Sequence, residues 1–202
     1  MIYKFNVPED INKKLLTWIT DKSELSTEAL AGNIQEEYSL TKYMHLLEPF
    51  IFFELSKIEP LMNRCKNSLD EVLYPNAQTL TISSLWVNYQ KKHEFNPMHC
   101  HSGVFSFIIF LKIPFLIEEE HLKSPGCNSN CNKSAGLSFF SLNSDQKGNI
   151  DETTLFVDKK WEKSGVFFNS DLNHCVYPFF SEGERITISG NLMYSNKDMI
   201  KK

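Results

Sequence analysis

Two histidines one residue apart, His99 and His101, are the first candidates for chemistry in this chain, in the segment FNPMHCHSGVFSFIIFL. Alternate side chains of an extended strand share a face, so these two imidazoles would point the same way and Cys100 the opposite way. Neutral imidazole binds iron, zinc, copper and nickel, so the pair makes half of a metal site. An isolated pair of this kind is equally compatible with two partly exposed histidines at a strand edge.

A third histidine, His174, follows another strand-like run in SGVFFNSDLNHCVYPF, so three of the six histidines become candidates for one metal site. Asp171, three residues before His174, is an alternative carboxylate ligand or a partner that orients an imidazole. We rank Asp171 below His101 as a ligand. The remaining histidines are expected to be structural or exposed, namely His45, His93 and His121.

Arg185 opens the strand-like segment ERITISGNLMY and shares a strand face with Thr187. A guanidinium beside a hydroxyl inside a mostly apolar barrel is unfavourable unless an anion pairs with it. A small dicarboxylic acid would be a suitable anion. The alternative is an ordinary surface ion pair with Glu182 or Glu184, of a kind that contributes little to stability.

The composition fits one globular domain over residues 1–202. The 202 residues, 42% of them hydrophobic, suffice for one core, and the net charge of -4 offers no basic surplus for nucleic acid. Charges and a proline near the N-terminus argue against a secretory signal, and Lys112 and Pro114 interrupt the longest apolar stretch before it could span a membrane. We expect a soluble cytoplasmic protein, in the host cytoplasm if it is viral.

The five cysteines are an odd number and do not suggest a disulfide framework. Cys65, Cys100 and Cys175 lie within patterned segments, which favours reduced thiols. Cys127 and Cys131 form a pair in the loop SPGCNSNCNKS that could hold zinc or close a small disulfide, but no second pair completes a tetrahedral site. A plain loop is the preferred interpretation.

The elements that must position these residues fall into two parts. Residues 1–75 have a mostly helical pattern, with Pro8 suited to a first helical turn and Pro49 suited to open another helix. After Pro75, short runs rich in Val, Ile, Thr and Phe predict a core of antiparallel strands over 76–195, with the helices covering an outer face. The expected strands are 79–89, 104–113, 136–142, 153–157, 165–169, 174–179 and 185–194.

From Trp86 to Asn191 the sequence resembles the 2-oxoglutarate/Fe(II)-dependent oxygenase superfamily, especially its phage and bacterial branch with an H-x-H motif. The resemblance covers about half of the chain. It rests on four motifs, W-x-N-Y from Trp86 to Tyr89, P-x-H-x-H-S-G from Pro97 to Gly103, FFNS-x-x-x-H ending at His174, and Arg185-x-Thr187.

The resemblance implies a mainly β fold with N-terminal helices, the double-stranded β-helix or cupin-like jelly roll. It also implies that His99 and His174 bind iron(II), that Arg185 and Thr187 hold the far carboxylate of 2-oxoglutarate, and that Tyr89 reaches this cosubstrate. His101 stands where the superfamily usually has a carboxylate. A neutral third ligand would leave the iron site one negative charge short.

The function implied is an Fe(II)- and 2-oxoglutarate-dependent dioxygenase that hydroxylates an unidentified small-molecule or peptidyl substrate and decarboxylates 2-oxoglutarate to succinate. Two alternatives stay open, a cupin-type three-histidine metalloenzyme without 2-oxoglutarate and a non-catalytic jelly-roll binding or virion-structural protein. A substrate pocket could be lined by Phe139, Phe140, Trp161 and Phe168, although aromatics at strand spacing more often form core. The helical first third could shape an entrance or a homodimer contact.

Overall fold

A computed structural model describes residues 2–26, 32–58, 77–142 and 148–196 of the chain. Cys65 and residues 59–75 of the expected helical region lie outside these ranges. Within the described part of the chain, no helix has the length and apolar content needed to cross a membrane.

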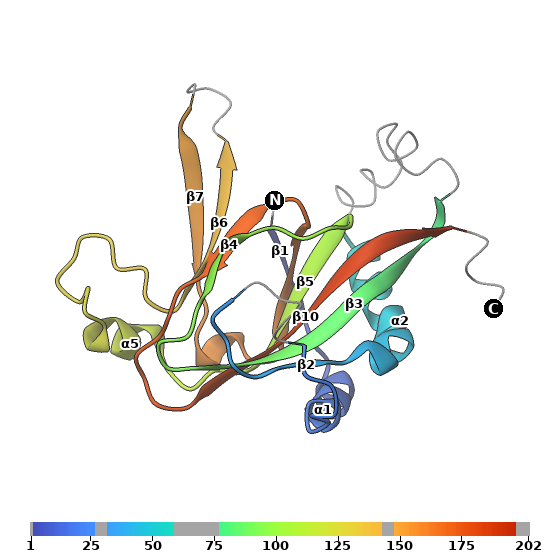
Figure 1. The fold of residues 1–202 in the computed structure, drawn as a ribbon, viewed down its shortest axis with the longest axis horizontal. Coiled ribbons are helices and arrows are strands. Elements are labelled where there is room, and N and C mark those ends of the chain that lie inside the picture. Colours follow the sequence, from blue (N-terminus) through green and yellow to red (C-terminus); the bar gives the residue numbers. More distant parts are fainter. Residues whose placement is uncertain (1, 27–31, 59–76, 143–147, 197–202) are drawn as a thin grey trace.

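The described residues form two antiparallel sheets (Figure 1), which confirms the predicted mainly β jelly roll. The larger sheet has the strand order β1-β8-β5-β10-β3-β2, and its strands are β1 (Ile2–Asn6), β8 (Ser164–Asn169), β5 (Phe105–Lys112), β10 (Glu184–Asn196), β3 (Ala77–Lys91) and β2 (Glu37–Ser39). The smaller sheet has the order β4-β9-β6-β7, and its strands are β4 (Asn96–His99), β9 (Asn173–Val176), β6 (Gly136–Leu142) and β7 (Ile150–Phe156).

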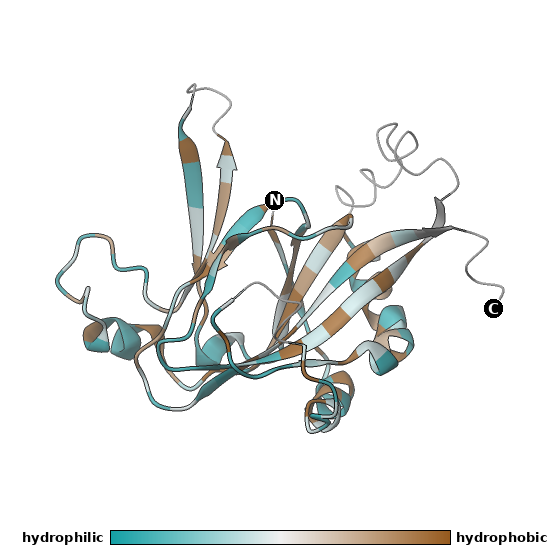
Figure 2. Cartoon of the chain, viewed as in Figure 1, coloured by the Kyte–Doolittle hydropathy of each residue, from teal (hydrophilic) through white to brown (hydrophobic). Residues whose placement is uncertain are grey.

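The central strand β5 is buried on both faces, which explains why its sequence FSFIIFL is apolar except for Ser106. Phe107 and Ile109 belong to the core between the larger sheet and the helices. Ile108 and Phe110, which alternate with them, belong to the core between the two sheets. Figure 2 shows the apolar colouring of this strand in the middle of the larger sheet.

Two helices cover the outer face of the larger sheet, as predicted (Figure 1). Helix α1 (Glu9–Trp18) follows Pro8 and contributes Leu15 and Trp18 to the core. Helix α2 (Met44–Ser56) follows a 3-10 turn and contributes Leu47, Phe50, Ile51 and Leu55. Pro49 lies inside α2 and does not open it, so that part of the prediction is wrong.

The structure contains short elements that the sequence pattern did not predict. Strands β1 and β2 lie within the expected helical region and form the two edges of the larger sheet. Helix α5 (Ile117–Lys123) lies between β5 and β6, and a 3-10 turn (Lys159–Trp161) precedes β8. Each of the seven expected strands is present, with ends that differ by a few residues, and β4 is an additional strand that carries His99.

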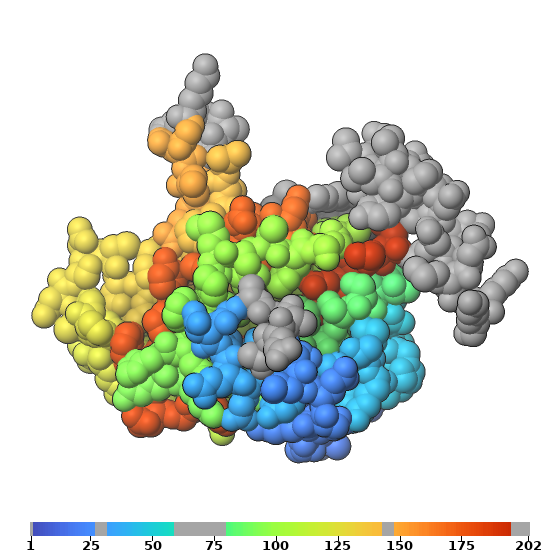
Figure 3. Space-filling model, viewed as in Figure 1, coloured from blue at the N-terminus to red at the C-terminus, as the bar shows by residue number. Residues whose placement is uncertain are grey.

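The β6–β7 hairpin projects from the body of the molecule (Figure 3). Its apolar side chains Leu142 and Ile150 are 81% and 61% exposed. The base of the same hairpin is buried, because Leu137 and Phe139 of β6 enter the core between the sheets. The buried part of β6 is the part that pairs with β9, the strand of His174.

Candidate metal centre and anion site

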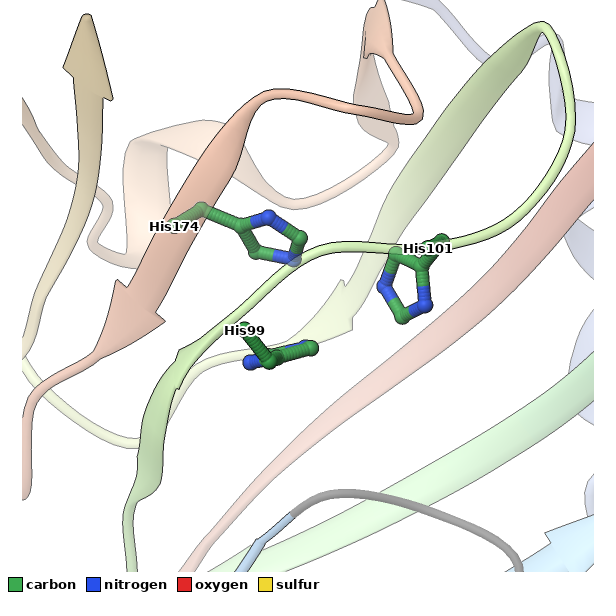
Figure 4. Close-up of side chains that lie close together, drawn as sticks. All are labelled: His99, His101 and His174. Atoms are coloured by element: carbon green, nitrogen blue, oxygen red, sulfur yellow. The ribbon is translucent and has the colours of Figure 1, made fainter.

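The register of the smaller sheet brings two of the three candidate histidines face to face. His99 at the end of β4 is directly opposite His174 of β9. Directly opposite residues of an antiparallel pair share a face, so both imidazoles point to the interior. His101 lies two residues beyond β4, where its backbone N–H donates to the Ser170 carbonyl over 2.8 Å. Figure 4 shows the three rings around one space.

The three imidazoles are spaced for one metal ion. One ring nitrogen from each histidine lies within 4.8 Å of the other two, and no further group of three ligand side chains is found in the described part of the chain. The ring centroids of His99 and His174 are 4.3 Å apart, and those of His101 and His174 are 5.1 Å apart. Since a metal-bound nitrogen lies about 2.1 Å from its ion, small side-chain movements suffice to bring all three nitrogens to one centre.

Backbone carbonyls fix the tautomers of two histidines. Nδ1 of His99 lies 2.7 Å from the Pro97 carbonyl oxygen, and Nδ1 of His174 lies 2.9 Å from the Leu172 carbonyl oxygen. A carbonyl can only accept, so each Nδ1 carries the proton and donates it. Each Nε2 then keeps its lone pair for a metal, an arrangement typical of metal-bound histidine.

The environment also keeps His101 and His174 neutral. Burial lowers the pKa of His101 to about 3, and the neighbouring His174 and His99 lower it further. Burial lowers the pKa of His174 to about 4. The ring centroids of Phe168 and His174 are 4.9 Å apart, and those of Trp86 and His101 are 5.7 Å apart. Both imidazoles are therefore unprotonated at neutral pH, which is the form that binds metal.

Arg185 is a buried cation that forms no direct ion pair with a carboxylate of the described residues. Its side chain is 3% exposed, and no carboxylate lies within ion-pair distance of it among the residues the structure describes. The alternative of a surface ion pair is wrong, because Glu182 pairs with Lys92 over 2.7 Å instead. Burial lowers the pKa of Arg185 to about 10, an effect that the charge of Glu120 opposes, so the guanidinium stays protonated at neutral pH.

Neutral oxygens hold the Arg185 guanidinium in place. Oε1 of Gln90 accepts from Nε over 2.9 Å and from Nη2 over 2.6 Å, and the Ala135 carbonyl accepts from Nη1 over 2.8 Å. The Tyr177 carbonyl lies 3.4 Å from Nη2. A guanidinium has five N–H groups and these contacts use four, so one N–H on Nη1 is left for a ligand. An anionic ligand would supply the charge that the protein does not.

One cavity contains both the histidines and the arginine. It encloses about 610 Å³, including the part that opens to solvent. Side chains from both sheets line it, among them the three histidines, Trp86, Asn88, Gln90, Asn96, Ser106, Phe168, Arg185, Thr187, Ser189 and Asn191. The residues fit the two groups that the sequence suggests, because neutral nitrogens converge at one place and an unneutralised cation lies at another in the same cavity.

Tyr89 lies on the other face of the larger sheet, and the prediction that it reaches the cosubstrate is wrong. Its hydroxyl donates to the Ile19 carbonyl, and its ring packs against Tyr38 in the core beneath the helices. Successive strand residues alternate faces, so its neighbours Asn88 and Gln90 line the cavity in its place. The period-two pattern of SLWVNYQ, apolar at every second position, was the available signal.

The other candidates lie away from the metal centre. Asp171 is exposed in the turn between β8 and β9 and does not belong to the cluster of ligands. Cys127 and Cys131 are free and exposed, as expected for a plain loop. Of the four aromatic residues proposed for a pocket, Phe168 lines the cavity and Phe139 packs beside it against His174. Phe140 and Trp161 line a separate groove between β1 and the β6–β7 hairpin.

Comparison of the sequence with protein families gives one match. The model of the family described as "Putative 2OG-Fe(II) oxygenase" matches residues 84–191, which is more than half of the chain. This range contains the three histidines, Arg185 and Thr187. A comparison with curated proteins found no match.

Solved structures share the fold at low sequence identity. A prolyl-4-hydroxylase from Pseudomonas putida gives a TM-score of 0.50 at 11% identity and covers 96% of this chain and 92% of its own. A prolyl hydroxylase from Trichoplax adhaerens, solved with a hypoxia inducible factor peptide fragment, gives 0.50 at 11% identity over 100% of this chain and 87% of its own. An oxidoreductase of the 2OG-Fe(II) oxygenase family from Burkholderia pseudomallei gives 0.41 at 14% identity over 68% of this chain. The match spans 58% of the length of that protein.

The fold is thus the double-stranded β-helix of the oxygenases. The chain belongs to the 2OG-Fe(II) oxygenase family. It is an enzyme of a class whose cofactors are Fe(II) and 2-oxoglutarate.

Proposed function

We propose that this protein is a dioxygenase that hydroxylates a C–H bond of an organic substrate and converts 2-oxoglutarate to succinate. The observation that carries the proposal is the buried Arg185, which has no carboxylate partner among the described residues and lies in the same cavity as three imidazoles. When bound, iron(II) and 2-oxoglutarate activate O₂, with one oxygen atom entering the substrate and the other entering succinate as CO₂ leaves.

The protein residues bind and orient these groups. His99, His101 and His174 would hold the metal, with the carbonyls of Pro97 and Leu172 keeping two of the rings in the correct tautomer. Arg185 and Thr187 would hold the far carboxylate of 2-oxoglutarate through charge-assisted hydrogen bonds. The aromatic rings of Phe168 and Trp86 beside the histidines would limit the access of water and so strengthen the electrostatic contacts in the cavity.

A second candidate is a three-histidine metalloenzyme that does not use 2-oxoglutarate. The observation in its favour is the ligand set itself, because all three clustered side chains are histidines and none is a carboxylate. This candidate gives no role to the buried guanidinium of Arg185. A buried cation without a ligand would only destabilise the protein, so this candidate explains the cavity less well than the dioxygenase does.

Replacement of Arg185 distinguishes the two candidates. Titration of 2-oxoglutarate into anaerobic protein loaded with Fe(II) should show binding, and Arg185→Ala should weaken it by about 100-fold or more, because the anion loses a charged hydrogen-bond partner. Succinate formation without added substrate should fall in parallel. Lys92→Ala, which removes a surface cation paired with Glu182, is the control and should leave both unchanged.

The opposite result would sink the proposal. If wild-type protein with Fe(II) neither bound 2-oxoglutarate nor formed succinate, the dioxygenase assignment would be wrong. If Arg185→Ala kept the metal and the wild-type affinity, another residue would hold the far carboxylate. A His99→Ala, His174→Ala double variant that kept its metal would place the metal elsewhere.

A further inference from the structure

A tryptophan and an asparagine of β3 form the wall of the cavity beside Thr187. Trp86 is 7% exposed and Asn88 is 6% exposed, and both side chains line the cavity. The Trp86 indole Nε1–H donates to Oδ1 of Asn88 over 3.1 Å. Asn88 is directly opposite Thr187 in the pairing of β3 with β10, so the two side chains share a face.

The tryptophan fixes which way the Asn88 amide points. An indole N–H can only donate, so it must face the amide oxygen and not the amide nitrogen. Nδ2 of Asn88 is then turned to β10, where it lies 3.2 Å from Oγ1 of Thr187 and 3.3 Å from Oγ of Ser189. The amide nitrogen has two N–H groups, one for each hydroxyl.

These contacts determine where the hydroxyl protons can go. A hydroxyl has one proton to donate, and the Thr187 oxygen already accepts from Asn88. Among the described residues, no acceptor for the Thr187 proton is found, and the side chain lines the cavity. The same holds for Ser189. Both hydroxyls are thus left as donors to a ligand in the cavity that Arg185 also lines.

We propose that Asn88, oriented by Trp86, is a positioning residue that turns the Thr187 and Ser189 hydroxyls into donors toward an anionic ligand. The inference rests on the proposed binding of 2-oxoglutarate and adds to it the residue that sets the direction of the hydrogen bonds. The indole donates to the amide oxygen and the amide donates to the two hydroxyls, whose own protons are left for a ligand in the cavity. Trp86 also packs on His101, so one side chain contacts the metal site and orients the anion site.

The test compares two ligands that differ only at the far end. 2-Oxopentanoate has a methyl group where 2-oxoglutarate has its far carboxylate, so the ratio of their dissociation constants measures recognition of that carboxylate. Titration into anaerobic Fe(II)-loaded protein gives both constants. Asn88→Asp replaces the donor with a carboxylate that accepts from both hydroxyls, and it should lower the preference for 2-oxoglutarate by about 10-fold or more.

Two further variants separate orientation from added charge. Asn88→Ala leaves the hydroxyls unoriented, and it should lower the preference less than Asn88→Asp does. In a Thr187→Val, Ser189→Ala background the Asn88→Ala change should have a much smaller effect, because Asn88 acts through these two hydroxyls. Asn12→Asp makes the same chemical change at a buried asparagine of α1 and should leave the preference at its wild-type value.

The outcomes are distinct. If Asn88→Asp changed the dissociation constants of 2-oxoglutarate and 2-oxopentanoate by the same factor, their ratio would stay at the wild-type value. That result would show that Asn88 has only a structural role. It would overturn the inference and leave the proposed function standing. Absence of 2-oxoglutarate binding to the wild type would overturn both the proposed function and this inference. If Asn88→Asp failed to fold, Trp86→Phe would decide, because it keeps an aromatic ring but frees the amide to turn, and an unchanged preference there would overturn the inference.

Discussion

His101 differs from the other two histidines in the way it is held. His99 and His174 each donate from Nδ1 to a carbonyl two residues earlier. His101 is positioned by its backbone, through the bond to the Ser170 carbonyl, and by contact with Trp86. It is also the histidine at which the sequence resemblance implied a carboxylate. Its role as a ligand is therefore the most informative one to test.

Replacement of His101 should show whether the metal requires a ligand at that position. His101→Ala should weaken Fe(II) binding by about 10- to 100-fold, whereas His101→Asp should stay within about 10-fold of the wild type, because a carboxylate is an equally suitable ligand for iron. Competition with a coloured chelator under anaerobic conditions measures both affinities. His93→Ala, at an exposed histidine, is the control. Wild-type affinity in His101→Ala would exclude it as a ligand.

At the scale of elements, helix α5 holds the loop between β9 and β10. Glu120 of α5 is fully buried, and its carboxylate accepts from the backbone N–H of Phe180 over 2.6 Å and of Ser181 over 3.0 Å. The Ser181 hydroxyl donates to the same carboxylate over 2.6 Å. This loop begins with Tyr177, whose carbonyl lies near the Arg185 guanidinium.

Removal of the Glu120 carboxylate should destabilise the protein strongly. Glu120→Ala leaves two backbone donors and a hydroxyl buried without an acceptor, and each such group costs about 1 to 3 kcal/mol. We expect a loss of about 3 kcal/mol or more in the free energy of unfolding, measured by urea denaturation. Glu119→Ala, an exposed neighbour on the same helix, should change it by less than about 0.5 kcal/mol. Equal effects of the two changes would contradict this role of Glu120.

Edge strand β2 carries a buried carboxylate that, unlike that of Glu120, accepts no hydrogen bond from the described residues. Glu37 is 1% exposed, and neither of its carboxylate oxygens has a hydrogen-bond partner among the described residues. Burial raises the pKa of Glu37 to about 7, and the nearby charge of Glu94 adds to the effect. The group is thus most stable in its protonated form.

The raised pKa of Glu37 predicts that stability is lost as the pH rises. The folded state holds the Glu37 proton more tightly than the unfolded state does. The contribution of Glu37 to the free energy of unfolding is therefore complete below the pKa of the unfolded state, near 4.5, and is lost as the pH rises through the folded pKa of about 7. Glu37→Gln should therefore be more stable than the wild type by about 2 kcal/mol at pH 8, and the difference should shrink toward pH 5. Urea denaturation at the two pH values measures it, with Glu24→Gln as the exposed control. A pH-independent difference would contradict the assigned pKa.

The longer elements could be predicted from the sequence because their patterns are local. β5 and β10 have runs of β-branched and aromatic residues bounded by turn residues, and both are present as expected. The short elements could not be predicted. β1 forms only because β8 offers it a partner, and the seven residues of α5, with three consecutive glutamates, have no apolar periodicity that would indicate burial of Glu120.

The site could also be predicted in part, because some of its features depend on local sequence patterns. The spacing of His99 and His101 predicted a shared orientation, and the register of β4 with β9 confirms that His174 joins them. The orientation of the Asn88 amide depends on Trp86 and Thr187, and the latter lies on a strand distant in sequence. No local pattern contains that information.

At the scale of the molecule, the proposed metal and anion sites lie on different sheets. His99 and His174 belong to the smaller sheet, whereas Arg185 and Thr187 belong to β10 of the larger sheet. A ligand that contacts both the metal and Arg185 would connect the two sheets across the cavity. Metal and 2-oxoglutarate should therefore bind with positive coupling, each raising the affinity of the other by the same factor.

This coupling should appear in thermal unfolding of the anaerobic protein. A ligand at about 100 times its dissociation constant adds about 2.7 kcal/mol, which corresponds to a rise in Tm of about 5 to 10 °C for a chain of this size. Fe(II) alone should raise Tm, 2-oxoglutarate alone should have little effect, and the two together should exceed the sum of the separate shifts. Arg185→Ala should keep the shift due to Fe(II) and lose the increment from 2-oxoglutarate, whereas His174→Ala should lose both. If 2-oxoglutarate raised Tm equally with and without metal, the two sites would be independent and the ligand would not connect the sheets.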